Sequence, residues 1–218
     1  MRLGLLRRLH VWIAWAAGVP ILFWTVSGLW MVARPIEEVR GTGLRAEPVS
    51  FLPGGLEAPA GAFRSLALET QGERLVWIAI TEQGRAFRAD TVTGDALPPV
   101  GRAEAVALAR GALKDPPAVL SATRTPAGAP PVDLRRPRPA WGVEFDGGAR
   151  VYVDADTGQV LALRTRQWRA FDWMWGLHIM DLGGREDTSH PVLIASAALA
   201  LLVTLVGLAL LLFTRRRR

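Results

Sequence analysis

Three histidines are the side chains of this chain best suited to bind a cofactor, because the sequence has no cysteine and only one lysine. A neutral imidazole is a common ligand of metal ions and of haem iron. His10 lies at the start of one long apolar segment, and His178 and His190 lie shortly before another. We therefore treat His10 and His178 as candidate axial ligands of a haem b and ask which elements would position them.

His10 follows Arg7 and Arg8 at the point where an apolar helix is expected to begin. The ring can simply lie among lipid headgroups beside these arginines, as amphipathic side chains do, and this interpretation stays open. The alternative is haem ligation, because small residues follow on one helical face at spacings of three and four and would let a second helix or a flat macrocycle approach. These residues are Ala14, Ala17, Gly18, Ile21, Thr25 and Gly28.

His178 belongs to residues 166–182, which are expected to form an amphipathic helix in the outer membrane interface. Phe171, Met174, Trp175 and His178 share one helical face. An interfacial histidine among aromatic residues is the simpler interpretation, but such a pocket also suits the edge of a haem. Asp181 at position i+3 is predicted to hold the other ring nitrogen.

Other chemistry has little support in the sequence. His190 directly precedes Pro191, so we expect it at the N-terminal boundary of a helix. No Gly-rich phosphate loop carries the single lysine, and no Gly-x-Ser-x-Gly turn frames Ser189. The absence of cysteine excludes disulfides and thiolate metal sites. We therefore assign no catalytic residue and no metal site.

Two apolar segments, 9–33 and 191–213, are each long enough to cross a hydrocarbon core of about 30 Å as a helix. Arginines flank both on the outer side: Arg2, Arg7 and Arg8 before the first, and Arg215, Arg216, Arg217 and Arg218 after the second. By the positive-inside rule, residues 1–8 and 214–218 are cytoplasmic and the segment between the helices lies outside the cytoplasm.

The first apolar segment could also be read as a cleaved signal peptide, but the apolar part of such peptides spans only about 7–15 residues. The second segment carries a stripe of small residues expected to pack on the first helix or on a second copy of the chain. The stripe consists of Ser196, Ala200, Thr204 and Gly207.

The net charge of +6 comes from the two ends of the chain. Without the seven flanking arginines the middle segment is nearly neutral, with about one net negative charge. A basic surface for nucleic acid is therefore not expected, and the lipid bilayer is the nearest partner of the basic ends.

The middle segment contains an internal repeat with an offset of 64 residues. Identical residues recur at this offset without a gap: Trp77 and Trp141, Gly84 and Gly148, Asp90 and Asp154, Thr93 and Thr157, Gly94 and Gly158, Leu97 and Leu161. Alternating residues predict two hairpins, 75–81 with 86–89 and 141–145 with 150–154. The shared Asp-x-x-Thr-Gly ending predicts a tight turn. A calcium site at Asp154 and Asp156 is the alternative.

The second copy predicts a small α+β unit. A helix over 102–113 and a strand over 119–125 precede a proline-rich surface loop, 126–139, and then the hairpin. The whole chain is thus expected to be a membrane α+β protein. Its two transmembrane helices flank an extracytoplasmic domain of two helix-plus-antiparallel-sheet units, a degenerate one over 34–101 and a clearer one over 102–165.

The segment Val151 to Leu161 resembles the last hairpin of the PepSY domain, which ends in a similar Asp-x-x-Thr-Gly-x-Val turn. The run Arg8 to Trp12, Thr25 to Gly28 in the same helix, and Gly176 to His178 resemble the PepSY-associated transmembrane family. The resemblance implies a bacterial inner-membrane protein with a periplasmic domain, tied to iron uptake. Larger members have four or more membrane helices, and some are haem-containing reductases of ferric siderophores.

Two functions follow as expectations. One is a haem-dependent electron-transfer subunit for ferric siderophore reduction, acting as a homodimer because His10 and His178 lie too far apart to share one haem within a chain. The other is a non-enzymatic, membrane-tethered PepSY module that binds or inhibits a periplasmic protein.

Overall fold

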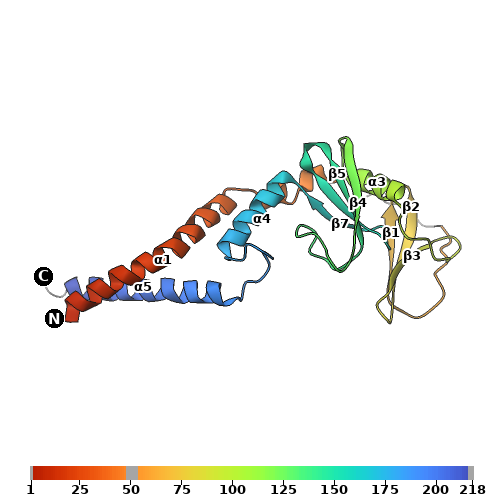
Figure 1. Cartoon of the computed structure of the whole chain (residues 1–218). Coiled ribbons are helices and arrows are strands. Elements are labelled where there is room, and N and C mark those ends of the chain that lie inside the picture. Colours follow the sequence, from red (N-terminus) through yellow and green to blue (C-terminus); the bar gives the residue numbers. More distant parts are fainter. Residues whose placement is uncertain (1, 48–53, 216–218) are drawn as a thin grey trace. The chain divides into compact units, whose positions relative to one another are not determined.

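The computed structural model describes residues 2–47 and 54–215, which form two compact units (Figure 1). The helical unit combines residues 1–35 with 170–218, and the second unit spans 36–169. We describe each unit by itself. Residues 1, 48–53 and 216–218 lie outside the described residues, and with them part of the expected first repeat and the end of the arginine tail.

The helical unit is built from α1 (Arg2–Val32), the second part of α4 (Arg166–His178), and α5 (Pro191–Arg215). Both α1 and α5 are long and apolar enough to cross a membrane, which suggests membrane association. Helix α1 begins at Arg2 and not at the predicted residue 9, so Arg7 and Arg8 lie within the helix. Helices α1 and α5 pack together around Ala17 and Val203, while most other apolar side chains of both helices are exposed in the isolated chain.

The first sheet of the second unit contains β1 (Phe63–Gln71), β2 (Arg74–Thr81) and β3 (Ala86–Asp90) in antiparallel order. The short helices α2 (Ile36–Val39) and η1 (Thr42–Leu44) precede it. The described residues 54–101 contain these strands and no helix. A helix-plus-sheet unit is therefore present in the second copy, whereas the described part of the first copy provides a sheet and only the short helices α2 and η1.

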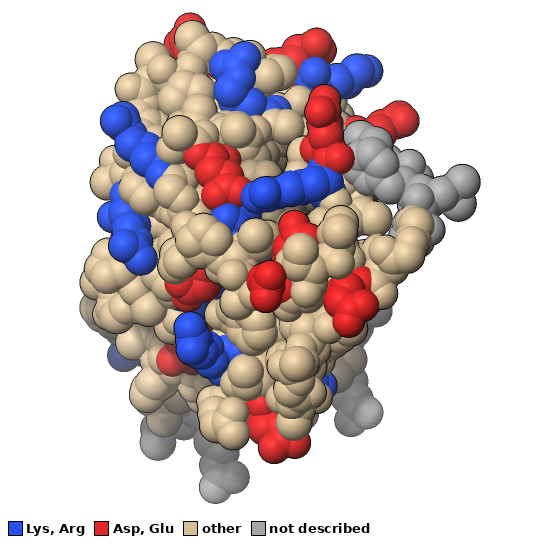
Figure 2. All heavy atoms as spheres, turned by 90° about the vertical axis from the view of Figure 1, so that its right-hand side faces the viewer, with Lys and Arg blue, Asp and Glu red and all other residues tan. Residues whose placement is uncertain are grey.

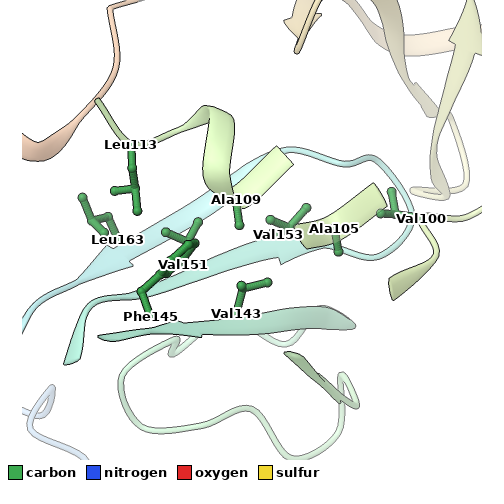
Figure 3. Packing of buried hydrophobic residues seen from close by; sticks show 9 residues of the cluster. All are labelled: Val100, Ala105, Ala109, Leu113, Val143, Phe145, Val151, Val153 and Leu163. Carbon is green, nitrogen blue, oxygen red and sulfur yellow. The ribbon is translucent and has the colours of Figure 1, made fainter. Parts of the chain in front are cut away.

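The second sheet lies under α3 (Arg102–Gly111) and has the order β4 (Val119–Thr125), β5 (Ala140–Phe145), β6 (Arg150–Asp154), β7 (Val160–Arg164). The short helix η2 (Asp146–Gly148) forms the turn between β5 and β6. Fully buried Ala105 and Ala109 let α3 approach the alternate residues Val143, Val151 and Val153 of the sheet (Figure 3). Burying each valine contributes roughly 1.5–3 kcal/mol to stability.

The repeat predicted from the 64-residue offset is present in the backbone. Trp77 pairs with Ala89 in the first sheet, and Trp141 pairs with Val153 in the second. Each of the five residue pairs between β2 and β3 has its counterpart 64 residues later between β5 and β6. The two sheets also share a register irregularity, between Phe63 and Ser65 in β1 and between Val119 and Ser121 in β4. The similarity thus extends to the strand before each hairpin.

The turns after the two hairpins are equivalent as well. Asp90 accepts hydrogen bonds from the backbone N–H groups of Val92 and Thr93, and Asp154 accepts them from Asp156 and Thr157. The two turn glycines have φ of 73° and 75°. Asp154 is fully buried, and its second oxygen lies 2.7 Å from Arg138 Nε. One oxygen of Asp154 therefore stabilises the turn and the other faces a positive charge, so calcium is not needed to explain the carboxylate.

Polar side chains join the two sheets. The amide of Gln71, at the end of β1, donates to the carbonyl of Thr157 at 2.6 Å. Its carbonyl oxygen accepts from Arg88 at 3.2 Å. Arg88 lies on β3 and also reaches Glu104 on α3. All three contacts belong to the second unit, so its two sheets form one body.

Candidate cofactor site in the helical unit

His178 is the last residue of α4 and is held by the end of α1. Its Nδ1 lies 3.0 Å from Ser27 Oγ, and its backbone carbonyl accepts a hydrogen bond from Trp24 Nε1 at 2.6 Å. A Cβ placed on Gly28 would lie 3.5 Å from His178 Cε1. The glycine therefore lets the imidazole lie close to the backbone of α1.

His10 is packed differently. Its ring faces α5, where a Cβ on Gly207 would lie only 3.1 Å from His10 Cε1. Its Nδ1 is buried and has no hydrogen-bond partner in the described part of the chain. A buried polar nitrogen without a partner is unusual and is one sign of a missing ligand.

The structure does not bring the two candidate ligands together. The His178 ring lies against Gly28, and eighteen residues of α1 separate Gly28 from His10. This corresponds to a rise of about 27 Å. The two histidines therefore do not form one site within the chain, and each imidazole lies beside a glycine.

The packed face of α1 differs from the predicted one. Ala14, Ala17 and Gly28 are at least partly covered, but Gly18, Ile21 and Thr25 are exposed in the chain. The fully buried polar residue is Ser27, two positions beyond Thr25 and therefore on another side of the helix. On α5, Thr204 is likewise exposed, whereas Ser196, Ala200 and Gly207 are partly covered as predicted.

The role predicted for Asp181 is wrong. Its carboxylate accepts hydrogen bonds from the backbone N–H groups of Gly184, Glu186 and Asp187 in the loop between α4 and α5, and Ser27 takes the place beside His178. The N–H groups of Glu186 and Asp187 lower the pKa of Asp181 to about 2. Asp181 therefore shapes the loop as a stable anion and does not contact the imidazole.

His190 has the boundary position expected for it. Helix α5 begins at Pro191, and the carbonyl of His190 accepts from the N–H of Ile194. The ring Nε2 lies 2.9 Å from the carbonyl oxygen of Ile179. His190 thus links the loop to the end of α4, and its ring nitrogen is already engaged.

The described residues of the second unit line pockets of about 600, 500 and 250 Å³. A pocket of about 600 Å³ is lined by apolar residues of both copies, including Phe87, Leu97 and Pro139, together with Arg85 and Asp156. A smaller one of about 250 Å³ lies on the second sheet beside Tyr152. Acidic and basic side chains are interspersed over the face in Figure 2, which gives no continuous basic surface for a nucleic acid there.

Comparison with known proteins identifies the second sheet and its helix. Residues 99–164 match the family described as Peptidase propeptide and YPEB domain, or PepSY. Residues 99–164 are thus similar to the PepSY domain, and an apolar helix lies near each end of the chain, an arrangement consistent with the PepSY-associated transmembrane proteins. No curated protein and no solved structure gave a significant match to the chain.

Proposed function

We propose that this protein is an inner-membrane electron-transfer subunit that binds haem b through His10 and His178 and delivers electrons to a ferric siderophore in iron uptake. The observation that supports it best is the pair of imidazoles at opposite ends of α1, each lying beside a glycine. A bound haem would supply one-electron chemistry at its iron. The protein residues would hold the axial positions and exclude water.

The partners and placement follow from the same proposal. A low-spin haem held by two imidazoles would need a second histidine, and the two histidines of one chain are about 27 Å apart along α1. A homodimer would provide two copies of His10 for one site and two copies of His178 for the other. The flanking arginines favour both termini in the cytoplasm and the PepSY domain in the periplasm.

The test is the visible spectrum of the full-length protein purified from haem-replete cells. We expect the split bands of a reduced low-spin haem, with a distinct share lost in His10→Ala and in His178→Ala. His190→Ala is the matched control, because His190 Nε2 already contacts a carbonyl. Colourless protein, or spectra unchanged in both ligand variants, would overturn the proposal.

A second function is supported by the pocket of about 600 Å³ between the two copies. Its mixed lining, with Phe87 and Leu97 beside Arg85 and Asp156, would suit an amphipathic side chain of a periplasmic protein, and the helices would then serve as an anchor. In that case Phe87→Ala would weaken capture of the partner, and the histidine variants would leave it unchanged.

A further inference from the structure

The hydroxyl of Ser27 lies 3.0 Å from Nδ1 of His178, where its own hydrogen bonds bear on which ring nitrogen carries the proton. A serine hydroxyl has one proton to donate. Ser27 Oγ lies within hydrogen-bond distance of the carbonyl oxygen of Phe23 one turn earlier, with a longer contact of 3.4 Å to that of Trp24. Carbonyl oxygens only accept, so the proton of Ser27 is committed to its own helix.

The contact between Ser27 and His178 must then run in the opposite direction. Ser27 Oγ, 3.0 Å away, can only accept, so Nδ1 of His178 must donate. A neutral imidazole has one N–H group, so Nε2 keeps its lone pair. No hydrogen-bond partner of Nε2 is present among residues 2–47 and 54–215.

The ring is also held in one orientation. Ser27 is fully buried, and Trp24 Nε1 fixes the backbone carbonyl of His178. The ring of Trp175 lies nearly parallel to the imidazole, at an angle of 20° and a centroid distance of 6.4 Å. Ser27 therefore contacts the ring itself, Trp24 holds the backbone of the same residue, and Trp175 lies alongside the imidazole.

We infer that Ser27 is the positioning residue of the His178 site: it fixes the Nδ1–H tautomer and thereby leaves the Nε2 lone pair for a haem iron. The positioning role of Ser27 rests on the proposed function only in that the ligand of Nε2 is taken to be a haem iron. A hydrogen bond from the second ring nitrogen makes an imidazole a stronger electron donor to its metal. His10 has no such bond, since its Nδ1 is unpartnered among the described residues, so the two sites should differ in reduction potential.

The first experiment uses the full-length, haem-free protein in detergent micelles with ¹⁵N-labelled histidine. Long-range proton–nitrogen spectra distinguish a protonated ring nitrogen from one with a lone pair. We expect Nδ1 of His178 protonated and Nε2 unprotonated. Ser27→Ala should remove this preference, and Ser27→Thr should restore it because the hydroxyl returns.

Thr25→Ala is the matched control. Thr25 Oγ1 also donates to a carbonyl one turn earlier, that of Ile21 at 2.8 Å, but Thr25 does not contact His178. The variant should leave the tautomer unchanged. An Nε2–H tautomer in the unmodified protein, or an unchanged tautomer in Ser27→Ala, would overturn the inference.

A second experiment separates this inference from the proposed function. In haem-loaded protein, the midpoint potential of the His178-dependent haem should rise in Ser27→Ala and stay unchanged in Thr25→Ala. An unshifted potential in Ser27→Ala would contradict the positioning role. Failure to bind haem would refute the proposed function, while the spectra of the haem-free protein would still decide the tautomer.

Discussion

The guanidinium of Arg88, which is 1% exposed, donates to both carboxylate oxygens of Glu104, at 2.7 and 2.6 Å. Arg88 lies on β3 of the first sheet and Glu104 lies on α3 of the PepSY domain. The remaining donors of Arg88 face Gln71 and the carbonyl of Pro98. The buried charge is therefore neutralised by a residue of the other copy.

Replacing Glu104 should cost more stability than an ordinary surface substitution. Glu104→Gln leaves the buried guanidinium without its counter-ion, and we expect a loss of about 3–5 kcal/mol in the free energy of unfolding. Chemical denaturation measures this loss. Arg74→Ala is the control, because Arg74 reaches the same carboxylate from a half-exposed position and should cost less than about 1 kcal/mol. Equal losses in both variants would contradict this account of the pair.

The same pair should make stability depend on pH. The hydrogen bond from Arg88 lowers the pKa of Glu104 below its usual value of 4.5. Because the folded pKa is the lower one, the stabilisation is present above the unfolded pKa and is lost as the pH falls through the folded pKa. The free energy of unfolding, measured at a series of pH values from neutral into acid, should therefore fall less steeply for Glu104→Gln than for the unmodified protein.

Gly158 should be much less tolerant of a side chain than Gly84. Both have positive φ, 75° and 84°, so a residue with a side chain would strain the backbone at either position. A Cβ at Gly158 would lie 2.7 Å from Gln71 Oε1, whereas the space around Gly84 is open. We expect Gly158→Ala to destabilise by roughly 2–4 kcal/mol and Gly84→Ala by about 1 kcal/mol. Similar melting temperatures for the two variants would show that the Gln71 side chain moves away from the new Cβ at little cost in stability.

Tyr152 is the only tyrosine, so the ultraviolet absorbance of tyrosinate reports on it alone. Burial, and the hydrogen bond to Asp133 at 2.6 Å, raise the pKa of Tyr152 to about 12. The folded pKa exceeds the unfolded one, so the associated stability is complete below about pH 10 and is lost as the pH rises toward 12. An alkaline titration of the native protein should have its midpoint above that of the denatured protein. Equal midpoints for the native and the denatured protein would contradict the claim that burial raises the pKa of Tyr152.

The topology can be tested with reporters that are active only outside the cytoplasm. Gly128 lies exposed in the loop between β4 and β5, which tolerates an insertion better than a strand does. We expect activity from a reporter inserted there and none from a fusion after Arg218. The reverse pattern would place the PepSY domain in the cytoplasm.

The hairpins could be predicted from the sequence because local signals define them. Alternating residues, the Asp-x-x-Thr-Gly turns and the tryptophans recur in both copies, and strands β4 and β6 have the predicted bounds. Strands β1 and β7 were not predicted. β1 is an edge strand with both faces largely exposed, so it lacks a clear alternation. In β7 the two buried residues, Ala162 and Leu163, are adjacent, so this strand also lacks the alternation that identifies a strand.

The partner of His178 could not be predicted for a different reason. Ser27 and His178 are 151 residues apart, and only the packing of α4 on α1 brings them together. Asp181 was the nearest polar candidate in the sequence, but the loop after α4 turns its carboxylate toward backbone N–H groups. The partners of a side chain at a helix end depend on tertiary packing, which spacing alone does not reveal.

The bonds of Gln71 to Thr157 and Arg88 link the unfolding of the two copies in the second unit. A duplicated domain usually keeps its own helix and can melt independently. Here the described part of the first copy depends on the second, because its buried arginine finds its counter-ion on the helix of the other copy. The second unit should therefore absorb heat in a single calorimetric peak, and the first sheet expressed without α3 should remain unfolded.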